Sequence, residues 1–259
     1  MDTMLLKENE RIDDLLTNNL KIIQSDEVFS FSLDAVLLAR FCHVPKRGKV
    51  LDLCTGNGVI PILLSTRCEG QIVGVEIQPR LCDMALRSVQ LNGLESSITI
   101  VCDDARRVHE RFGHGAFDHV TINPPYLPAT GRDKNINPYI ANARHELNGT
   151  LDELVNACAR LVKSGGKVSM VHRPARLTEI IETMRKYRLE PKRMRFVHPR
   201  LDEEANIVLI EAIKDGGVEL RLLPPMIVFE EGQTYTPELQ QIFYGRKARD
   251  ESYARTKKL

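Results

Sequence analysis

The chain has 259 residues, of which 42% are hydrophobic and 27% charged, a mix that is typical of a soluble globular protein and excludes disorder throughout. Its formal net charge of +1 indicates by itself neither a nucleic-acid nor a membrane partner. The six cysteines form no CxxC pair, which argues against a zinc site or a disulfide framework. The N-terminus is unlike a signal peptide and no apolar run could span a membrane, so we expect a cytoplasmic protein without a metal.

Apolar runs and turn signals predict alternating strands and helices along the chain. Strands are expected at residues 50–53, 71–76, 98–101, 117–122, 167–172, 193–198 and 206–213, and helices at 59–68, 80–92, 151–162 and 177–187. No helix separates the last two strands, so they should pair antiparallel. Crossovers between parallel strands are right-handed, which leaves few topologies. The order predicts an α/β protein with a doubly wound, Rossmann-like, seven-stranded, mostly parallel sheet and one antiparallel edge strand.

Three regions are expected along the chain. Residues 1–26 form an N-terminal extension, residues 27–214 form the α/β domain, and residues 215–259 form a C-terminal arm and a basic tail. The segment from Glu219 to Glu231 contains Pro224-Pro225 and is interpreted as an added hairpin or arm.

A glycine-containing loop follows the first strand of the α/β domain. It begins with Asp52 and contains Gly56 and Gly58, which allow a tight turn and close approach of a ligand. Glu76, at the end of the next strand, could accept both hydroxyls of a ribose. The dinucleotide fingerprint requires a third glycine where this chain has Pro61, and an acid at the start of the loop would repel a pyrophosphate. The loop therefore favours S-adenosylmethionine, which carries a sulfonium and an ammonium, over NAD.

A third acidic group follows the third strand, at Asp103-Asp104-Ala105. One of these acids could accept a hydrogen bond from the amino group of the cofactor adenine. Taken singly, an acid in such a position is also a common helix N-cap. Three acids at three consecutive strand ends are better explained by one shared ligand.

The motif Asn123-Pro124-Pro125-Tyr126 follows the fourth strand. An exocyclic amino or carboxamide nitrogen is a poor nucleophile because its lone pair is delocalised. The Asn123 side-chain oxygen and the Pro124 carbonyl could each accept one N–H, bend the nitrogen toward tetrahedral geometry and stabilise its developing charge. The Tyr126 ring could stack on a planar target. The motif therefore predicts methyl transfer to such a nitrogen, with alignment supplying most of the acceleration.

The motifs DLCTGNG, GVE, CDDA and NPPY resemble class I S-adenosylmethionine-dependent methyltransferases of the N6-adenine and glutamine-N5 branch, over about residues 27–214. FSFSLDAVLLA upstream and ARHE downstream of NPPY are similar to the bacterial tRNA(Val) adenine-N6 methyltransferases, which act on adenine 37. This resemblance implies a tRNA partner. It also implies roles around the cofactor, with Phe31 and Asp34 covering it, Asp52, Thr55, Gly56 and Gly58 at its methionine part, Glu76 at its ribose and Asp104 at its adenine. The paired acid leaves open whether Asp103 or Asp104 meets the adenine.

Basic residues could bind the phosphates of an RNA substrate. One basic stretch includes Arg193 and Arg195, and the tail includes Arg246, Lys247 and Arg249. Such stretches are about as often solvated faces or chain ends. Arg144-His145, with the following acid, is interpreted either as a salt-bridged connection or as a group that contacts RNA or closes the site.

Three other functions fit part of the pattern. Glutamine-N5 methyltransferases acting on peptide release factors also carry NPPY, but they usually have an N-terminal helical domain and differ after the motif. Methylation of an rRNA base is a second alternative. A non-catalytic RNA-binding protein of the same fold is a third, and the NPPY motif argues against it.

Overall fold

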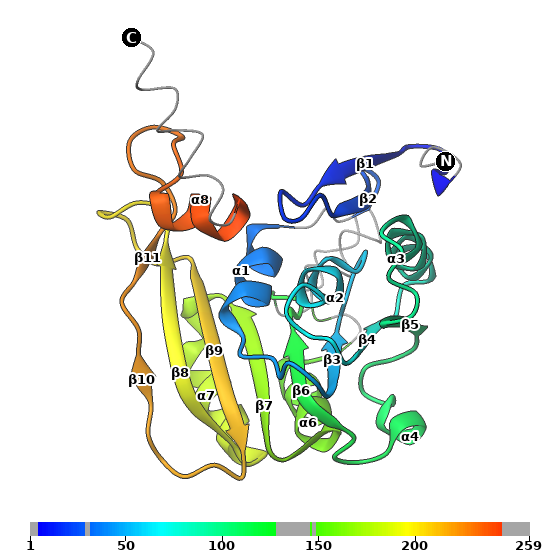
Figure 1. Ribbon diagram of the computed structural model, residues 1–259. Helices are drawn as coiled ribbons and strands as arrows, with labels where there is room; N and C mark the ends of the chain where they lie inside the picture. The colour runs from blue at the N-terminus through cyan, green and yellow to red at the C-terminus, as the bar shows by residue number, and fades with distance from the viewer. Residues whose placement is uncertain (1–4, 29–31, 128–145, 147–148, 245–259) are drawn as a thin grey trace.

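The computed structural model describes residues 5–28, 32–127, 146 and 149–244, which build one central sheet with helices on both faces (Figure 1). The strands are β1 Glu10–Asp14, β2 Lys21–Ser25, β3 Lys49–Leu53, β4 Gln71–Glu76, β5 Ile98–Cys102, β6 Phe117–Ile122, β7 Val162–His172, β8 Leu189–His198, β9 Ile207–Lys214, β10 Arg221–Leu222 and β11 Met226–Ile227. The helices are α1 Leu33–Phe41, α2 Val59–Leu64, α3 Pro79–Leu91, α4 His109–Phe112, α6 Leu151–Leu161, the 3₁₀ turn η4 Pro174–Arg176, α7 Leu177–Lys186 and α8 Pro237–Tyr244.

The sheet confirms the predicted Rossmann-like class, and the position of its antiparallel strand differs from the expectation. The strand order is β10-β8-β9-β7-β6-β3-β4-β5, and β11 also pairs with β8. β9 runs antiparallel to both neighbours, β7 and β8, so the antiparallel strand lies inside the sheet and not at its edge. The crossover through α7 places β8 one position away from β7, and the hairpin return of β9 fills the gap.

Two hydrophobic clusters cover the two faces of the sheet. One contains α1, α2 and α8 together with residues of β7 and β9. The other contains α6 and α7 and the opposite-facing residues of the central strands. The strands are buried on both faces, which is why they read as continuous apolar runs in the sequence.

The N-terminal residues form the hairpin β1–β2, which packs on α3 near the carboxyl ends of β3 and β4 (Figure 1). The Ile23 backbone N–H donates to the Ser88 hydroxyl at 3.1 Å, and the Asn57 side chain donates to the Ile23 carbonyl at 3.0 Å. A largely buried ion pair joins Glu10 to Arg87 of α3. These contacts attach the hairpin to the helix and to the loop after β3.

The C-terminal arm runs along the outer edge of the sheet. β10 and β11 do not pair with each other as a hairpin, because each pairs in parallel with β8. α8 then crosses toward α1, where the Thr17 hydroxyl donates to the Phe243 carbonyl at 3.0 Å. The arm is therefore packed on the α/β domain. The division into three regions stays a prediction.

Candidate active site

A cavity of about 520 Å³ lies at the carboxyl ends of β3, β4, β5 and β6. Its wall is completed by the start of α1 and by the residue that follows β7. Because carboxyl ends of parallel strands meet at one edge of a sheet, loops that are far apart in sequence converge there. The volume is in the range of pockets that bind small molecules.

The loop after β3 is held in a left-handed conformation. Cys54 and Gly56 both have φ of +59°, and Gly58 has φ of +91°. A Cβ at Gly56 would meet no atom within 4 Å, whereas a Cβ at Gly58 would come within 3.3 Å of Ala85. Gly56 therefore leaves space in the cavity, and Gly58, which does not line the cavity, allows α3 to pack closely.

Asp52 lies beneath the loop and is not part of the cavity wall. Its side chain is fully buried and accepts hydrogen bonds from the hydroxyls of Thr55 and Thr121, both at 2.6 Å. Burial raises the pKa of Asp52 to about 7. The sequence predicted that this acid would meet the charged groups of the cofactor, but the geometry gives it contacts that hold the loop.

Glu76, at the end of β4, faces the cavity, and its two oxygens accept from the backbone N–H groups of Gly56 and Gln78, each at 2.9 Å. Burial raises the pKa of Glu76 above its ordinary value. Gln78, which the sequence analysis did not select, also lines the cavity. Its Oε1 is buried and has no hydrogen-bond partner among the described residues. A ligand that donates hydrogen bonds would satisfy this orphaned acceptor.

Asp103, Asp104 and Ala105 all line the cavity beyond β5. Arg106 binds the Asp104 carboxylate through Nε at 2.9 Å and Nη2 at 2.5 Å. Burial raises the pKa of Asp104, but the hydrogen bonds from Arg106 outweigh it, so the pKa lies below its ordinary value. Asp103 Oδ1 accepts from the Asp104 backbone N–H at 2.7 Å. Its other oxygen has no printed partner within the described part of the chain, which makes it the freer acceptor.

The NPPY motif forms the opposite wall of the cavity, with Asn123, Pro124, Pro125 and Tyr126 all lining it. The Tyr126 hydroxyl lies 2.7 Å from Asp34 Oδ2 of α1 and 2.7 Å from Asn123 Oδ1. Burial and the neighbouring Asp34 carboxylate raise the pKa of Tyr126 well above its ordinary value. The phenol therefore keeps its proton and cannot serve as a base near neutral pH.

Two residues at the end of β7 pack on Tyr126 and were not found from the sequence. The Arg173 guanidinium lies 4.8 Å from the centre of the Tyr126 ring and 3.8 Å from Asp34. The buried His172 ring lies 5.0 Å from the same ring. Burial lowers the pKa of His172 to about 4, so it is neutral at physiological pH. Arg173 lines the cavity and places a cation beside the residues of the NPPY motif.

Glu146 closes the connection after the NPPY motif. It forms an ion pair with Arg176, and its backbone N–H donates to the Leu127 carbonyl at 2.8 Å. Arg176 also donates to the Tyr126 carbonyl at 3.3 Å. These contacts favour the salt-bridged interpretation for Glu146. Phe31, Arg144 and His145, which were predicted to contribute to the site, lie outside the described residues.

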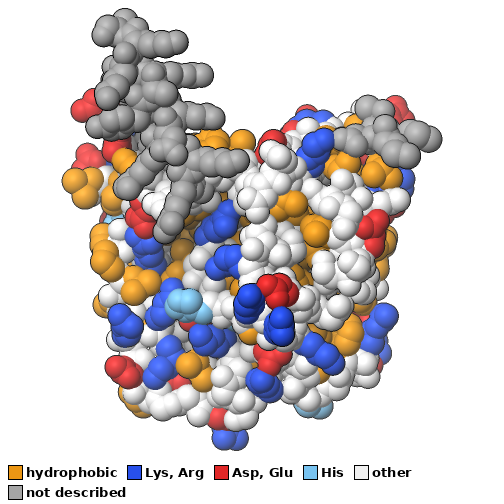
Figure 2. Space-filling view, in the orientation of Figure 1, with side chains coloured by type: hydrophobic (Ala, Val, Ile, Leu, Met, Phe, Trp, Pro, Cys, Tyr) orange, Lys and Arg blue, Asp and Glu red, His pale blue; other side chains and the backbone are white. Residues whose placement is uncertain are grey.

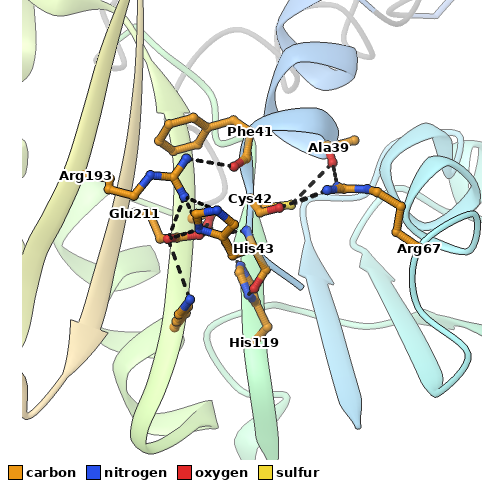
Figure 3. A network of polar contacts seen from close by, with 10 residues as sticks. Ala39, Phe41, Cys42, His43, Arg67, His119, Arg193 and Glu211 are labelled. Carbon is orange, nitrogen blue, oxygen red and sulfur yellow. Dashed lines mark hydrogen bonds and ion pairs between the residues drawn. The ribbon is translucent and has the colours of Figure 1, made fainter. Parts of the chain in front are cut away.

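Arg193 and Arg195 lie far along β8, and both have partners within the chain. Arg193 is hydrogen-bonded to Glu211 at 3.0 Å and lies over the Phe41 ring, as Figure 3 shows. Arg195 pairs with Glu238 at 2.7 Å and donates to the Pro224 carbonyl at 2.9 Å. These contacts indicate a structural role for both side chains. The tail residues Arg246, Lys247 and Arg249 are not among the described residues.

The described residues contain no helix long and apolar enough to cross a membrane. Among the same residues, no group of three or more His, Cys, Asp or Glu side chains could hold a metal ion. The predicted cytoplasmic location stays a prediction.

Sheet order, cavity position and the loop after β3 together define the Rossmann-like methyltransferase class. A solved structure described as a predicted O-methyltransferase from Agrobacterium tumefaciens superposes with a TM-score of 0.67 at 25% identity, covering 83% of this chain and 97% of that one. The family model for the methyltransferase small domain matches residues 19–196, which is more than half of the chain. The chain therefore belongs to the methyltransferase small domain family.

Curated relatives are similar at lower identity. One is a tRNA1(Val) (adenine(37)-N6)-methyltransferase from Bacteroides fragilis (strain YCH46), 28% identical over 138 residues, which are 53% of this chain and 57% of the relative. Another, from Methanocaldococcus jannaschii, carries a protein N5-glutamine methyltransferase name and is 29% identical over 170 residues, 64% of this chain and 82% of the relative. The match thus spans little more than half the length of the Bacteroides relative. The predicted class, an S-adenosylmethionine-dependent methyltransferase, is confirmed by the family and the fold.

Proposed function

We propose that this protein transfers a methyl group from S-adenosylmethionine to the N6 amino group of an adenine in tRNA, with adenine 37 of tRNA-Val as the specific candidate. The observation that carries the proposal is the presence of two acceptor groups of the NPPY motif in the same cavity as the acids after β4 and β5. The similarity to the Bacteroides tRNA methyltransferase supports the tRNA substrate.

The chemistry of the cavity fits the proposed cofactor. Glu76 is suited to the ribose hydroxyls, Asp103 to the adenine amino group, and the space beside Gly56 to the methionine part. The unpartnered Gln78 oxygen offers a further acceptor to a ligand rich in donors. Thr55 and Asp52 support this site from below. When bound, S-adenosylmethionine supplies an electrophilic methyl group on a sulfonium.

The residues of the NPPY motif act on the nucleophile. The Asn123 side-chain oxygen and the Pro124 carbonyl accept the two N–H groups of the amino nitrogen, which frees its lone pair from conjugation. No strong base is required, because the nitrogen becomes acidic as its positive charge develops. The protonated Tyr126 phenol and the fully buried His172 agree with a site that works by alignment and not by proton abstraction.

Arg173 favours a nucleic-acid substrate over an uncharged peptide. Its guanidinium stacks on Tyr126 at the cavity wall, which is where a planar base would have to enter. A base that replaces it leaves the cation beside the phosphates of the same strand. The bases of an anticodon loop are already splayed, so extrusion of one base costs little free energy.

A protein glutamine is the second candidate acceptor, because the Methanocaldococcus relative carries that name and an amide nitrogen poses the same chemical problem. The predicted rRNA base and the non-catalytic RNA-binding protein are further outcomes of the same experiment. Labelled methyl groups from S-adenosylmethionine should be offered separately to tRNA, rRNA and peptide release factor. The tRNA products are then digested and their nucleosides identified by mass spectrometry.

The proposal expects label in tRNA as N6-methyladenosine. Asn123→Ala should lower the rate about 100- to 1,000-fold, since one preorganised group is removed from the developing charge. Asn123→Asp keeps an acceptor oxygen and should retain measurable turnover. Cofactor affinity, measured by calorimetry, should change little in either variant. Label in the release factor alone would establish the second candidate, and no label in any acceptor would contradict the enzyme.

A further inference from the structure

One hydroxyl group faces two acceptors at the NPPY motif. The Tyr126 hydroxyl lies 2.7 Å from Asp34 Oδ2 and 2.7 Å from Asn123 Oδ1. A phenol carries one proton, so it can satisfy only one of these oxygens at a time. The choice matters because Asn123 Oδ1 is the oxygen that the proposed mechanism needs for the substrate nitrogen.

The carboxylate is the stronger acceptor of the two. Hydrogen bonds to an ionised group are about twice as strong as those between neutral groups. Asp34 is only 6% exposed, and the Arg173 guanidinium lies 3.8 Å from it and favours its charged form. The phenol proton is therefore directed to Asp34 and away from the neutral amide.

We infer that Asp34 is a positioning residue that takes the Tyr126 proton and so keeps the Asn123 side-chain oxygen free to accept an N–H of the substrate. This inference rests on the proposed use of Asn123, and it holds for an adenine or a glutamine acceptor alike. It differs from the role expected from the sequence, in which Asp34 covers the cofactor. Without the carboxylate, the phenol donates to Asn123 and competes with the substrate.

A double-mutant cycle tests this role, using the full chain with Asp34→Asn, Tyr126→Phe and both changes together. Asp34→Asn should lower the single-turnover rate about 10-fold, since one hydrogen bond of the order of 1.4 kcal/mol is redirected. In the Tyr126→Phe background, which has no phenol proton, Asp34→Asn should have no further effect. Calorimetry should give the same S-adenosylmethionine affinity, within about two-fold, for Asp34→Asn and the unchanged protein.

Two results of the cycle would overturn the inference. One is an equal loss of rate from Asp34→Asn in both backgrounds. The other is a loss of cofactor affinity that matches the loss of rate, which would make Asp34 a cofactor-covering residue. Asp26→Asn, at an exposed surface ion pair with Arg11, is the matched control for a carboxylate-to-amide change. Thermal unfolding checks that each variant is folded.

A measurement without substrate or cofactor separates this inference from the proposed function. Infrared difference spectra against the Tyr126→Phe protein isolate the C–O stretch of the Tyr126 phenol, which depends on the acceptor of its proton. The band should shift when Asp34 becomes Asn. An unchanged band would contradict the inference even if methyl transfer occurs. A shifted band combined with no methyl acceptor would contradict the proposed function alone.

Discussion

Single residues decide which parts of the cavity are open to a ligand. Gly56 and Gly93 have nearly the same backbone conformation, with φ of +59° and +64°, and neither has an atom within 4 Å of the position that a Cβ would occupy. Only Gly56 lines the cavity. The two positions therefore allow the strain of a side chain in this conformation to be separated from the space that it takes.

We expect Gly56→Val to weaken S-adenosylmethionine binding by about 100-fold, since overpacking of a filled site costs about 1–3 kcal/mol. Gly93→Val carries the same backbone strain and should leave the affinity unchanged. Calorimetric titration of both variants measures the difference. Equal losses at the two positions would show that strain, and not lost space, is responsible.

The sequence predicted most cavity residues because each follows a strand. Glu76, Asp103, Asp104, Asn123 and Tyr126 are all in the wall. Asp52 also follows from the motif, but the threonine hydroxyls that accept its attention come from β6 and from its own loop, which the sequence alone does not bring together. Gln78 and Arg173 carry no motif signal, so only the structure places them in the cavity.

At the scale of elements, a buried polar network joins three central strands. Glu211 of β9 accepts from the His43 backbone N–H at 2.8 Å and lies 3.3 Å from the Ser169 hydroxyl of β7. The His119 ring of β6 lies 3.0 Å from Ser169 and 3.2 Å from the His43 carbonyl. Figure 3 shows His43, Arg193 and Glu211 converging between the end of α1 and β9. The network joins the antiparallel strand to the parallel part of the sheet.

This network predicts a loss of stability in mild acid. Burial lowers the pKa of His119 to about 4, from an ordinary value of 6.5. The unfolded chain then binds the proton first, so the free energy of unfolding falls as the pH drops from 6.5 toward 4, by up to about 3 kcal/mol. His119→Gln should fall less steeply over that range in urea unfolding, and the exposed His114→Gln should follow the unchanged protein. Parallel curves for all three proteins would exclude His119 as the cause.

Local sequence signals predicted elements well where the signal is local. The capping box at Thr150 and Glu153 begins α6 as expected, with both reciprocal hydrogen bonds present. The insertion of β9 between β7 and β8 was not predicted, because strand order depends on crossover geometry and not on the residues of the strands. β10 and β11 were expected to form a hairpin or arm, and their parallel pairing with β8 also depends on the path of the chain.

For the whole molecule, charge on the surface depends on which bases are paired. Figure 2 shows Lys and Arg side chains on one face of the molecule, with acidic side chains among them. On the described surface, Lys46 and Arg47 pair with Glu69, and Lys163 pairs with Asp118. Arg193 and Arg195 are likewise held by Glu211 and Glu238. Clusters of bases in the sequence therefore overstate the charge that is free to bind phosphate.

We expect the double change Arg193→Gln and Arg195→Gln to leave the salt dependence of tRNA binding unchanged, because both guanidiniums are paired within the chain. Removal of residues 245–259 takes away six bases and should lower both the affinity and the slope of log K against log salt, since each phosphate contact contributes about 0.7–0.9 to that slope. Filter binding at several salt concentrations distinguishes the two. A smaller slope in the double variant would restore the RNA-binding role predicted for these arginines.

The sequence by itself determined the class of fold, the cofactor loop and the motif that meets the substrate. Each of these depends on residues within a few positions of one another, and the carboxyl ends of parallel strands bring such loops together in any sheet of this kind. The tertiary structure alone decided which oxygens face the cavity and which are already bonded. Asp34 and Tyr126 meet across 92 positions of the chain, and Arg193 finds Glu211 on the adjacent strand. Such contacts depend on how whole elements pack, and no local pattern of residues specifies them.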